Sequence, residues 1–213
     1  DPEYFIVNYV QIIHVDKGLV PFEMYDYQKD MIRKFNDNRF VICKMPRQTG
    51  KSTTIVAYLL HFALFNPQSN IAILANKGST SREILQRLKT AYEHLPKWLQ
   101  QGVVVWNRGN IELENGSKVI SASTSSSAVR GSSFNIIFMD EFAHIDPPKL
   151  AEDFFTSVYP TISSGKTTKV FIVSTPKGLN MFYKMWIDAE EKRSNYIPIE
   201  VHWSQTPGRD SKW

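Results

Sequence analysis

The chain has 213 residues, of which 42% are hydrophobic and 22% charged, and its 25 basic and 21 acidic residues give a net charge of +4. No apolar run is long enough to span a bilayer, and a single cysteine, Cys43, excludes an internal disulfide. The five histidines never pair at the helical spacing of zinc ligands. Because the chain starts at Asp1 and stops in the polar stretch SQTPGRDSKW, we expect a piece of a longer protein.

Repeated strand and helix patterns define the fold class. Residues 1–38 predict a helical lead-in, most periodic at 25–35. Four nearly unbroken apolar runs follow, at residues 40–45, 70–76, 134–141 and 169–176. Such runs indicate strands buried on both faces, as in a parallel sheet. Helical stretches come after them, at residues 51–65, 79–95, 147–159 and 179–193. This alternation predicts a doubly wound α/β fold with helices on both faces of a mostly parallel sheet.

The pattern changes between residues 102 and 124. Three short apolar segments are separated by turn residues, and Asn115-Gly116 is a strong hairpin signal. We expect an antiparallel insertion or sheet edge there. Residues 123–133 form a polar, serine-rich loop that leads into the third buried strand.

The stretch VICKMPRQTGKSTT, residues 41–54, runs from the first strand into a turn and then a helix. Ligands of open α/β sheets bind at this end of the strands, and a phosphate needs converging backbone N–H groups. Gly50 would let the backbone approach, Lys51 would contact the β- and γ-phosphates, and Ser52 would ligate Mg²⁺. Thr53 could reach the α-phosphate. The alternative is a chance Gly-Lys-Ser, because Met45 stands where such loops usually begin with glycine.

An acidic pair closes the third buried strand. Asp140 and Glu141 follow four apolar residues, and at the frayed end of a strand both can face one cavity. Asp140 would hold a metal-bound water, and Glu141 would polarise the water that attacks the γ-phosphate. The alternative is an ordinary acidic residue pair before a helix.

Four further candidates are weaker than these two motifs. Gln28 could read adenine through its amide, although an exposed helix glutamine fits the pattern better. Ser174-Thr175-Pro176 could sense the γ-phosphate or could simply end the strand. Arg47, inside the loop, could stabilise the charge that develops during phosphoryl transfer. Arg130, in the polar loop, could reach the nucleotide of a neighbouring subunit or could be a solvated loop arginine.

Together these segments resemble the ATPase domain of the large terminase subunit of tailed bacteriophages, the motor that packages DNA into a procapsid. The matching stretches are DYQKDM, MPRQTGKS, ILANKGSTSREIL, AVRGSSFNIIFMDEFAHI and STPKG. The resemblance implies a P-loop NTPase of the additional-strand, conserved-glutamate type, with ATP and Mg²⁺ as cofactors.

The resemblance also assigns site residues. It implies ATP contacts by the loop residues Arg47, Gln48, Thr49, Gly50, Lys51, Ser52 and Thr53 and by Gln28. It implies a Walker B pair at Asp140 and Glu141 and a coupling motif at Ser174, Thr175 and Pro176. The arginine finger falls on Arg47 within the chain or on Arg130 from a neighbour, and the resemblance leaves both open.

The resemblance implies a layout and a set of partners. We expect a core at residues 39–203 and the start of a linker at 204–213, without the C-terminal nuclease domain of the family. The expected partners are double-stranded DNA, the portal protein, the small terminase subunit and further copies in a ring, with no membrane. The expected location is the host bacterial cytoplasm.

Two other interpretations stay open. One is a superfamily 2 helicase-type translocase, and the other is a non-catalytic nucleotide-binding or scaffold module.

DNA contact by a basic surface is the least supported expectation. Its candidate residues are Lys77, Arg82, Arg87, Lys89, Lys166 and Lys169.

Overall fold

The computed structural model describes residues 1–14, 16–124 and 132–209. Its main sheet has eight strands in the order β10-β3-β9-β8-β4-β7-β6-β5. All neighbours from β10 to β7 pair in parallel, whereas β5 and β6 are antiparallel. The strands are β3 (Phe40–Lys44), β4 (Asn70–Ala75), β5 (Val103–Trp106), β6 (Asn110–Leu113), β7 (Lys118–Ser123), β8 (Ile136–Asp140), β9 (Lys169–Ser174) and β10 (Ile197–Glu200). The four predicted central strands are confirmed as β3, β4, β8 and β9.

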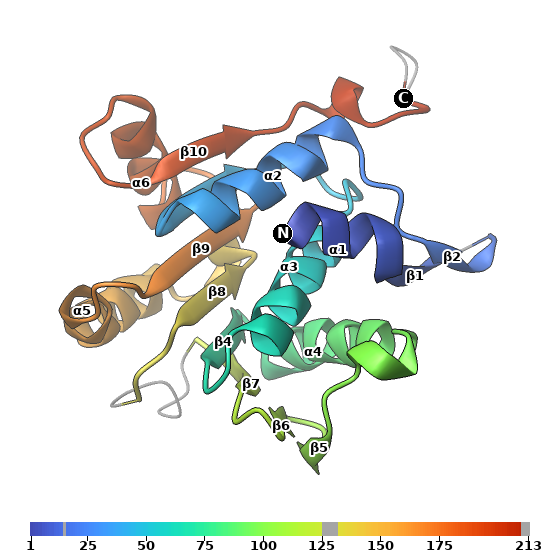
Figure 1. The fold of residues 1–213 in the computed structure, drawn as a ribbon. Coiled ribbons are helices and arrows are strands. Elements are labelled where there is room, and N and C mark those ends of the chain that lie inside the picture. Colours follow the sequence, from blue (N-terminus) through green and yellow to red (C-terminus); the bar gives the residue numbers. More distant parts are fainter. Residues whose placement is uncertain (15, 125–131, 210–213) are drawn as a thin grey trace.

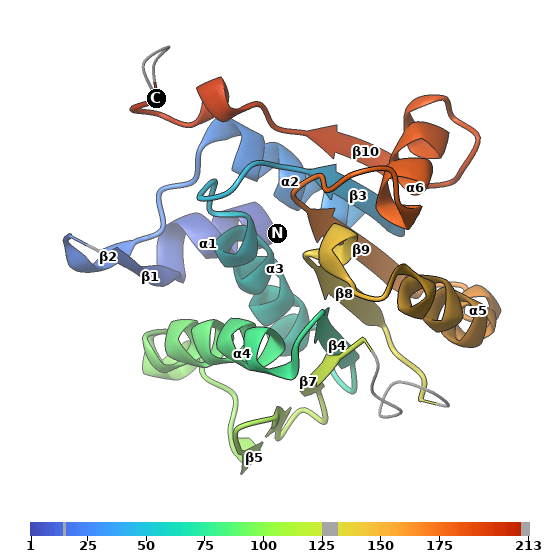
Figure 2. The same ribbon diagram turned by 180° about the vertical axis from the view of Figure 1, so that it is seen from behind.

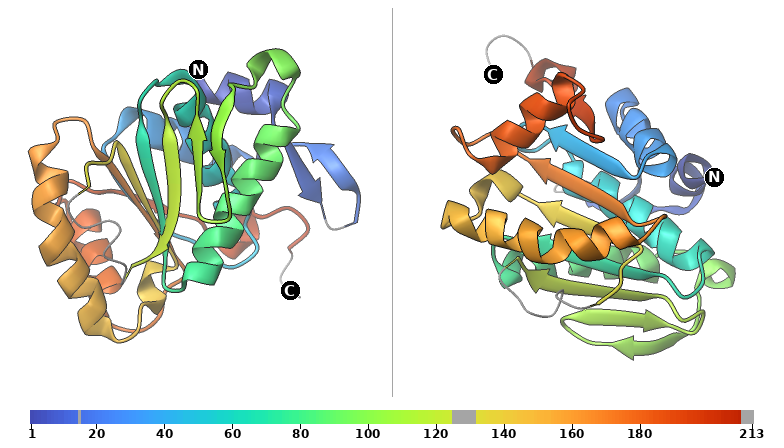
Figure 3. Two further views of the ribbon diagram at one scale, coloured as in Figure 1. Left: turned by 90° about the horizontal axis from the view of Figure 1, so that it is seen from below. Right: turned by 90° about the vertical axis from the view of Figure 1, so that its left-hand side faces the viewer.

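Helices cover both faces of this sheet. Figure 1 shows α5 and α6 on one side and α1, α3 and α4 on the other, and Figure 3 gives the same layers from two further directions. Successive residues of one strand enter different cores: Ile137 and Met139 of β8 pack on the side of α5 and α6, whereas Ile136 and Phe138 pack on the side of α1, α3 and α4. This double burial explains the unbroken apolar runs. The helices are α1 (Pro2–Tyr9), α2 (Asp26–Asp37), α3 (Lys51–Phe65), α4 (Gly78–Glu93), α5 (Pro148–Ser164) and α6 (Met181–Glu190).

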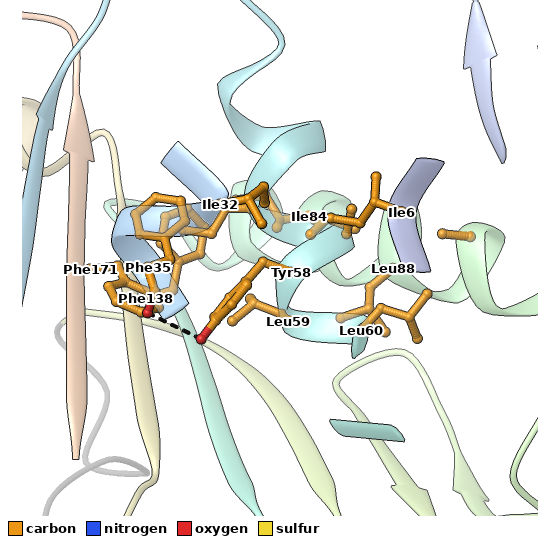
Figure 4. Close-up of a cluster of buried hydrophobic side chains, with 14 of the residues drawn as sticks. Ile6, Ile32, Phe35, Tyr58, Leu59, Leu60, Ile84, Leu88, Phe138 and Phe171 are labelled. Atoms are coloured by element: carbon orange, nitrogen blue, oxygen red, sulfur yellow. Dashed lines mark hydrogen bonds between the residues drawn. The ribbon is translucent and has the colours of Figure 1, made fainter. Parts of the chain in front are cut away.

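The larger core joins α2 and α3 to the sheet through aromatic side chains. The rings of Phe35 and Phe171 lie 4.5 Å apart, and Tyr58 packs against both. The hydroxyl of Tyr58 donates to the Phe35 carbonyl at 3.1 Å (Figure 4). Each such buried aromatic side chain contributes about 1.5–3 kcal/mol by leaving water. The helix that follows the first strand is therefore fixed firmly to the sheet.

Strand β9 lies between β3 and β8 and pairs with both. All three strands run in the same direction, so their carboxyl ends meet at one edge of the sheet. The loop after β3, the end of β9 at Ser174 and the end of β8 at Asp140 are thus neighbours in that order. Figure 2 shows β3 leading through this loop into α3.

Three segments differ from or refine the expectation. The helical lead-in is wrong for residues 11–21, where β1 (Gln11–His14) and β2 (Gly18–Pro21) form an antiparallel hairpin. Strand β10 was not predicted, because it has four residues and includes Pro198, which an edge strand tolerates. The antiparallel segment at 102–124 is confirmed as a sheet edge: β5, β6 and β7 form hairpins, and β7 also pairs in parallel with β4.

Within the described ranges, no helix combines the length and the apolar character needed to cross a membrane.

Candidate nucleotide-binding site

The loop between β3 and α3 turns sharply through two left-handed residues. Gln48 has a φ of 57° and Gly50 a φ of 71°. The Thr49 hydroxyl donates to the Pro46 carbonyl at 3.1 Å and closes the turn. A Cβ at position 50 would lie 2.5 Å from the Gln28 amide nitrogen. The left-handed backbone therefore favours glycine at position 50, and any larger residue there would displace the Gln28 amide.

Three side chains hold the outer side of this loop. The Tyr27 hydroxyl and the Gln28 amide donate to the Thr49 carbonyl at 2.8 and 3.3 Å. Arg209, from beyond the last strand, donates to the carbonyls of Arg47 at 3.2 Å and Gln48 at 2.8 Å. The loop is thus bonded on its outer side to both α2 and the C-terminal segment.

The acidic end of β8 meets the loop from the other side. Asp140 is the last strand residue, and Glu141 turns left-handed with a φ of 50° before the short 3₁₀ helix Phe142–His144. The Lys51 ammonium lies 2.5 Å from the Glu141 carboxylate. The two motifs predicted from the sequence therefore contact each other directly.

The end of β9 supports Glu141. The Thr175 hydroxyl donates to Glu141 Oε2 at 3.0 Å, and the Nε2 atom of His144 lies 2.7 Å from that hydroxyl. The Ser174 hydroxyl accepts from the Ala143 N–H at 3.0 Å, while the Ser174 carbonyl accepts from the Met45 N–H at 3.1 Å. Residues 174 and 175 thus connect the loop to the acidic end.

The two carboxyl groups differ in acidity. Burial raises the pKa of Asp140 to about 6, and the neighbouring Glu141 charge adds to this against the opposing Lys51. Burial also acts to raise the pKa of Glu141, but hydrogen bonds from Lys51 and Thr175 outweigh it and leave that pKa below its ordinary value. Glu141 is therefore the more readily ionised of the pair.

Asp140 offers one buried carboxylate oxygen that could ligate a magnesium ion. Asp140 is 5% exposed, and its Oδ1 atom has no hydrogen-bond partner. A buried carboxylate oxygen without a donor fits a hard cation. Among the described residues, no group of three or more His, Cys, Asp or Glu side chains gathers as a metal cluster. An ion at Asp140 and Ser52 would accordingly complete its shell with phosphate oxygens and water.

A cavity of about 550 Å³ opens above the loop, a size suited to a small ligand. Its lining residues come from the loop, the start of α3, the β4–α4 connection, α4 and the acidic end: Arg47, Gln48, Thr49, Gly50, Lys51, Ser52, Asn76, Lys77, Thr80, Arg87, Glu141 and His144. Most of the loop residues predicted from the sequence therefore face one space.

Several predicted residues lie elsewhere. Thr53 lines a neighbouring cavity between β1, α3 and α4, and Pro176 lines a cavity beside α6. Gln28 is 2% exposed, with its amide oxygen accepting from the Tyr25 N–H at 2.9 Å and its nitrogen bonded to Thr49. Adenine recognition by Gln28 stays a prediction, and each of its two amide atoms already makes one hydrogen bond within the fold. Arg130 lies outside the described residues.

Two of the six lysine and arginine residues expected on a basic surface make hydrogen bonds inside the fold. Lys89 is 4% exposed, donates to the Asn107 carbonyl and lies over the Trp106 ring. Lys169 donates to three carbonyls at the end of α2. Both ammonium groups are therefore already used as donors within the fold.

The sequence pattern missed Tyr27, His144, Arg87 and Arg209 as parts of the site. Arg209 and Gln48 are 161 residues apart in the chain, so no local pattern could connect them. His144 carried a weak signal, because it follows the acidic pair by one helical turn.

A phosphate-type loop after β3, an acidic pair ending β8 and an extra strand between them define a P-loop NTPase of the additional-strand type. The model of the family described as terminase large subunit, T4likevirus-type, N-terminal, matches residues 42–208. This match covers most of the chain, and the chain therefore belongs to that family.

Solved large terminases share the fold. The large terminase of bacteriophage HK97 has a TM-score of 0.79 at 19% identity, over 98% of this chain and 44% of that one. The ATPase domain of the Thermus phage P74-26 large terminase has a TM-score of 0.72 at 21% identity, over 88% of this chain and 85% of the domain. A large terminase from another thermophilic bacteriophage, in complex with ATP-gamma-S, has a TM-score of 0.69 at 13% identity. This match covers 89% of this chain and 47% of that one. This chain thus spans less than half of the first and third of these proteins.

Proposed function

We propose that this chain binds and hydrolyses Mg-ATP and that its turnover drives double-stranded DNA into a viral procapsid. The observation that carries the proposal is the meeting of Lys51 and Glu141 at the carboxyl edge of the sheet, 2.5 Å apart. A phosphate-binding lysine beside an ionised carboxylate, at the rim of a ligand-sized cavity, suits hydrolysis of a phosphoanhydride. One large terminase from a thermophilic bacteriophage, which shares the fold, has been solved with ATP-gamma-S.

Binding would use the loop and the start of α3. The N–H groups of Gln48, Thr49 and Gly50 and the ammonium of Lys51 offer positive partners to a triphosphate. Ser52 and Asp140 would hold the magnesium ion, which neutralises phosphate charge when it is bound. Lys51 would have to exchange Glu141 for phosphate oxygens, because its ammonium already contacts that carboxylate.

Hydrolysis would use Glu141 as the group that accepts a proton from the attacking water. Thr175 and His144 hold the other side of the Glu141 carboxylate and so fix its direction. Arg47, on the rim of the cavity, or Arg130, from a neighbouring copy, would stabilise the charge that develops on the phosphoryl oxygens.

The whole protein would do more than this chain. By analogy with its family we propose a ring on the portal protein, contact with the small terminase subunit, action in the host bacterial cytoplasm and a separate nuclease domain. A helicase-type translocase is the less favoured alternative, because the family match identifies the chain with terminase large subunits. A non-catalytic module is disfavoured by the intact Lys51 and Glu141.

The test is ATP turnover by purified chain with and without procapsids and double-stranded DNA. We expect Mg-dependent release of phosphate that rises when procapsids and DNA are both present. Binding of Mg-ATP without any turnover under these conditions would favour the non-catalytic module. Turnover driven by DNA alone, with unwinding of a duplex, would favour the helicase alternative.

A further inference from the structure

Three consecutive carbonyl groups of the β3–α3 loop are bound by side chains from outside the loop. Arg209 donates to the carbonyls of Arg47 and Gln48 at 3.2 and 2.8 Å. Tyr27 and Gln28 donate to the carbonyl of Thr49 at 2.8 and 3.3 Å. The donors come from α2 and from the segment after β10, two elements at opposite ends of the chain.

Peptide geometry converts these bonds into a constraint on the cavity side. The peptide bonds of the loop are trans, and a trans peptide points its C=O and its N–H in opposite directions. Holding the carbonyls of Arg47, Gln48 and Thr49 outward therefore turns the N–H groups of the following residues inward. Those residues are Gln48, Thr49 and Gly50, and all three line the cavity.

We propose that Tyr27, Gln28 and Arg209 are positioning residues that preset the loop for a triphosphate by holding these three carbonyls. The inference rests on the proposed function of the cavity and adds residues to it. The three side chains do not line the cavity themselves, so they act on the ligand through the backbone. The result is a loop whose anion-binding N–H groups are arranged before the ligand arrives.

Backbone strain and burial both support this role. Gln48 is a non-glycine residue in the left-handed region, a conformation that persists only when its surroundings hold it. The shortest Arg209 bond goes to the Gln48 carbonyl. Tyr27 and Gln28 are 8% and 2% exposed, so water does not compete for their bonds. Gln28 is itself fixed by the Tyr25 N–H, which keeps its nitrogen directed at Thr49.

The segment after the last strand belongs to the site for the same reason. It includes the 3₁₀ helix Trp203–Gln205 and the buried Thr206, and Figures 1 and 2 show it beside the start of α2. Arg209 connects this segment to the phosphate loop. Any movement of residues 203–209 would then alter triphosphate affinity.

The experiment compares two tyrosines that make the same type of bond. Tyr27→Phe removes a hydroxyl that donates to a loop carbonyl, and Tyr58→Phe removes one that donates to the Phe35 carbonyl in the core. Calorimetry with Mg-ATP and with inorganic tripolyphosphate gives the affinity, and thermal unfolding without ligand gives the stability. We expect Tyr27→Phe to weaken both ligands about fivefold, since one hydrogen bond is lost. Tyr58→Phe should lower stability and leave both affinities unchanged.

Arg209→Gln provides the second variant, and Arg209→Lys retains the charge without the planar fork. We expect both to weaken tripolyphosphate binding, and the loss relative to the unaltered chain should be equal at low and high salt. A loss that vanished at high salt, or full rescue by lysine, would mean simple charge attraction and would overturn the inference.

The two proposals fail in different ways. No binding of Mg-ATP or tripolyphosphate by the unaltered chain would overturn the proposed function and this inference with it. Normal binding by the unaltered chain, with equal affinity in Tyr27→Phe and Arg209→Gln, would overturn the inference alone.

Discussion

The ammonium of Lys51 lies 2.5 Å from the carboxylate of Glu141, although the two residues are 90 positions apart. Each group neutralises the other, and neither is free for the role that the site gives it. A triphosphate that draws Lys51 to its oxygens would release one oxygen of Glu141 toward the attacking water. Ligand binding and preparation of the base are therefore linked through one ion pair.

Glu141→Gln is expected to separate binding from hydrolysis. The amide cannot take a proton from water, so turnover should fall about 100-fold or more. Mg-ATP should still bind, and more tightly than to the parent chain, because Lys51 no longer has to leave a carboxylate. Single-turnover hydrolysis and calorimetry measure the two effects. Glu200→Gln is the matched control. Glu200, on β10, also pairs with a lysine, since its carboxylate lies 2.9 Å from the ammonium of Lys44 on β3. Unchanged hydrolysis in Glu141→Gln would assign the base to another group.

The arginine finger is expected to show itself in the concentration dependence of hydrolysis. If Arg130 acts on a neighbouring copy, activity of the dilute chain is low and rises more than linearly with protein concentration. Arg130→Ala should then remove the rise without affecting ATP binding. Linear scaling, together with a harmless Arg130→Ala, would assign the finger to Arg47 of the same chain.

Lys169→Met is expected to destabilise the fold without touching the cavity. The Lys169 ammonium donates to the carbonyls of Phe35, Asn36 and Asn38 at 2.8, 2.7 and 3.1 Å. Methionine retains the stem but leaves these carbonyls without a donor, at a cost of about 2 kcal/mol in the free energy of unfolding. Lys118→Met, which breaks only an exposed pair with Glu112, should cost less than about 1 kcal/mol. Equal losses in a urea titration would contradict the capping role.

His61 is expected to make the fold sensitive to acid. Its ring packs between Phe5 and Phe65, its Nδ1 atom has no partner, and burial lowers its pKa from 6.5 to about 4. The unfolded chain takes up a proton near pH 6.5 and the folded chain only near pH 4. The contribution to stability is therefore complete above pH 6.5 and is lost as the pH falls toward 4.

His61→Phe should flatten the fall in stability between pH 6.5 and 4, as measured by urea unfolding at several pH values. The exposed His94, at the C-cap of α4, is substituted in the same way and controls for removal of a histidine. Parallel curves for the parent chain and His61→Phe would show that another group causes the acid response.

The central strands and the two motifs could be predicted because their signals are local. A strand that is buried on both faces needs an unbroken apolar run, which is visible in the sequence. The residues of each motif, Gly50-Lys51-Ser52 and Asp140-Glu141, are contiguous. Strand β10 and the hairpin β1–β2 gave no such signal, because four-residue strands at an edge need few apolar residues.

The supports of the site could not be predicted, because they depend on tertiary contacts. Gln28 illustrates the difference: its place before the loop was recognised, but its contact with the Thr49 carbonyl depends on how α2 packs. Lys89 and Lys169 resembled surface charges in the sequence, whereas the fold uses both as internal donors.

The position of β9 also sets the distance between the phosphate-type loop and the acidic pair. Neighbouring strands are about 4.8 Å apart, so one intervening strand separates the backbones of β3 and β8 by about 9.6 Å. The end of β9 fills this gap, and Ser174 and Thr175 hydrogen-bond to the loop on one side and to Glu141 on the other.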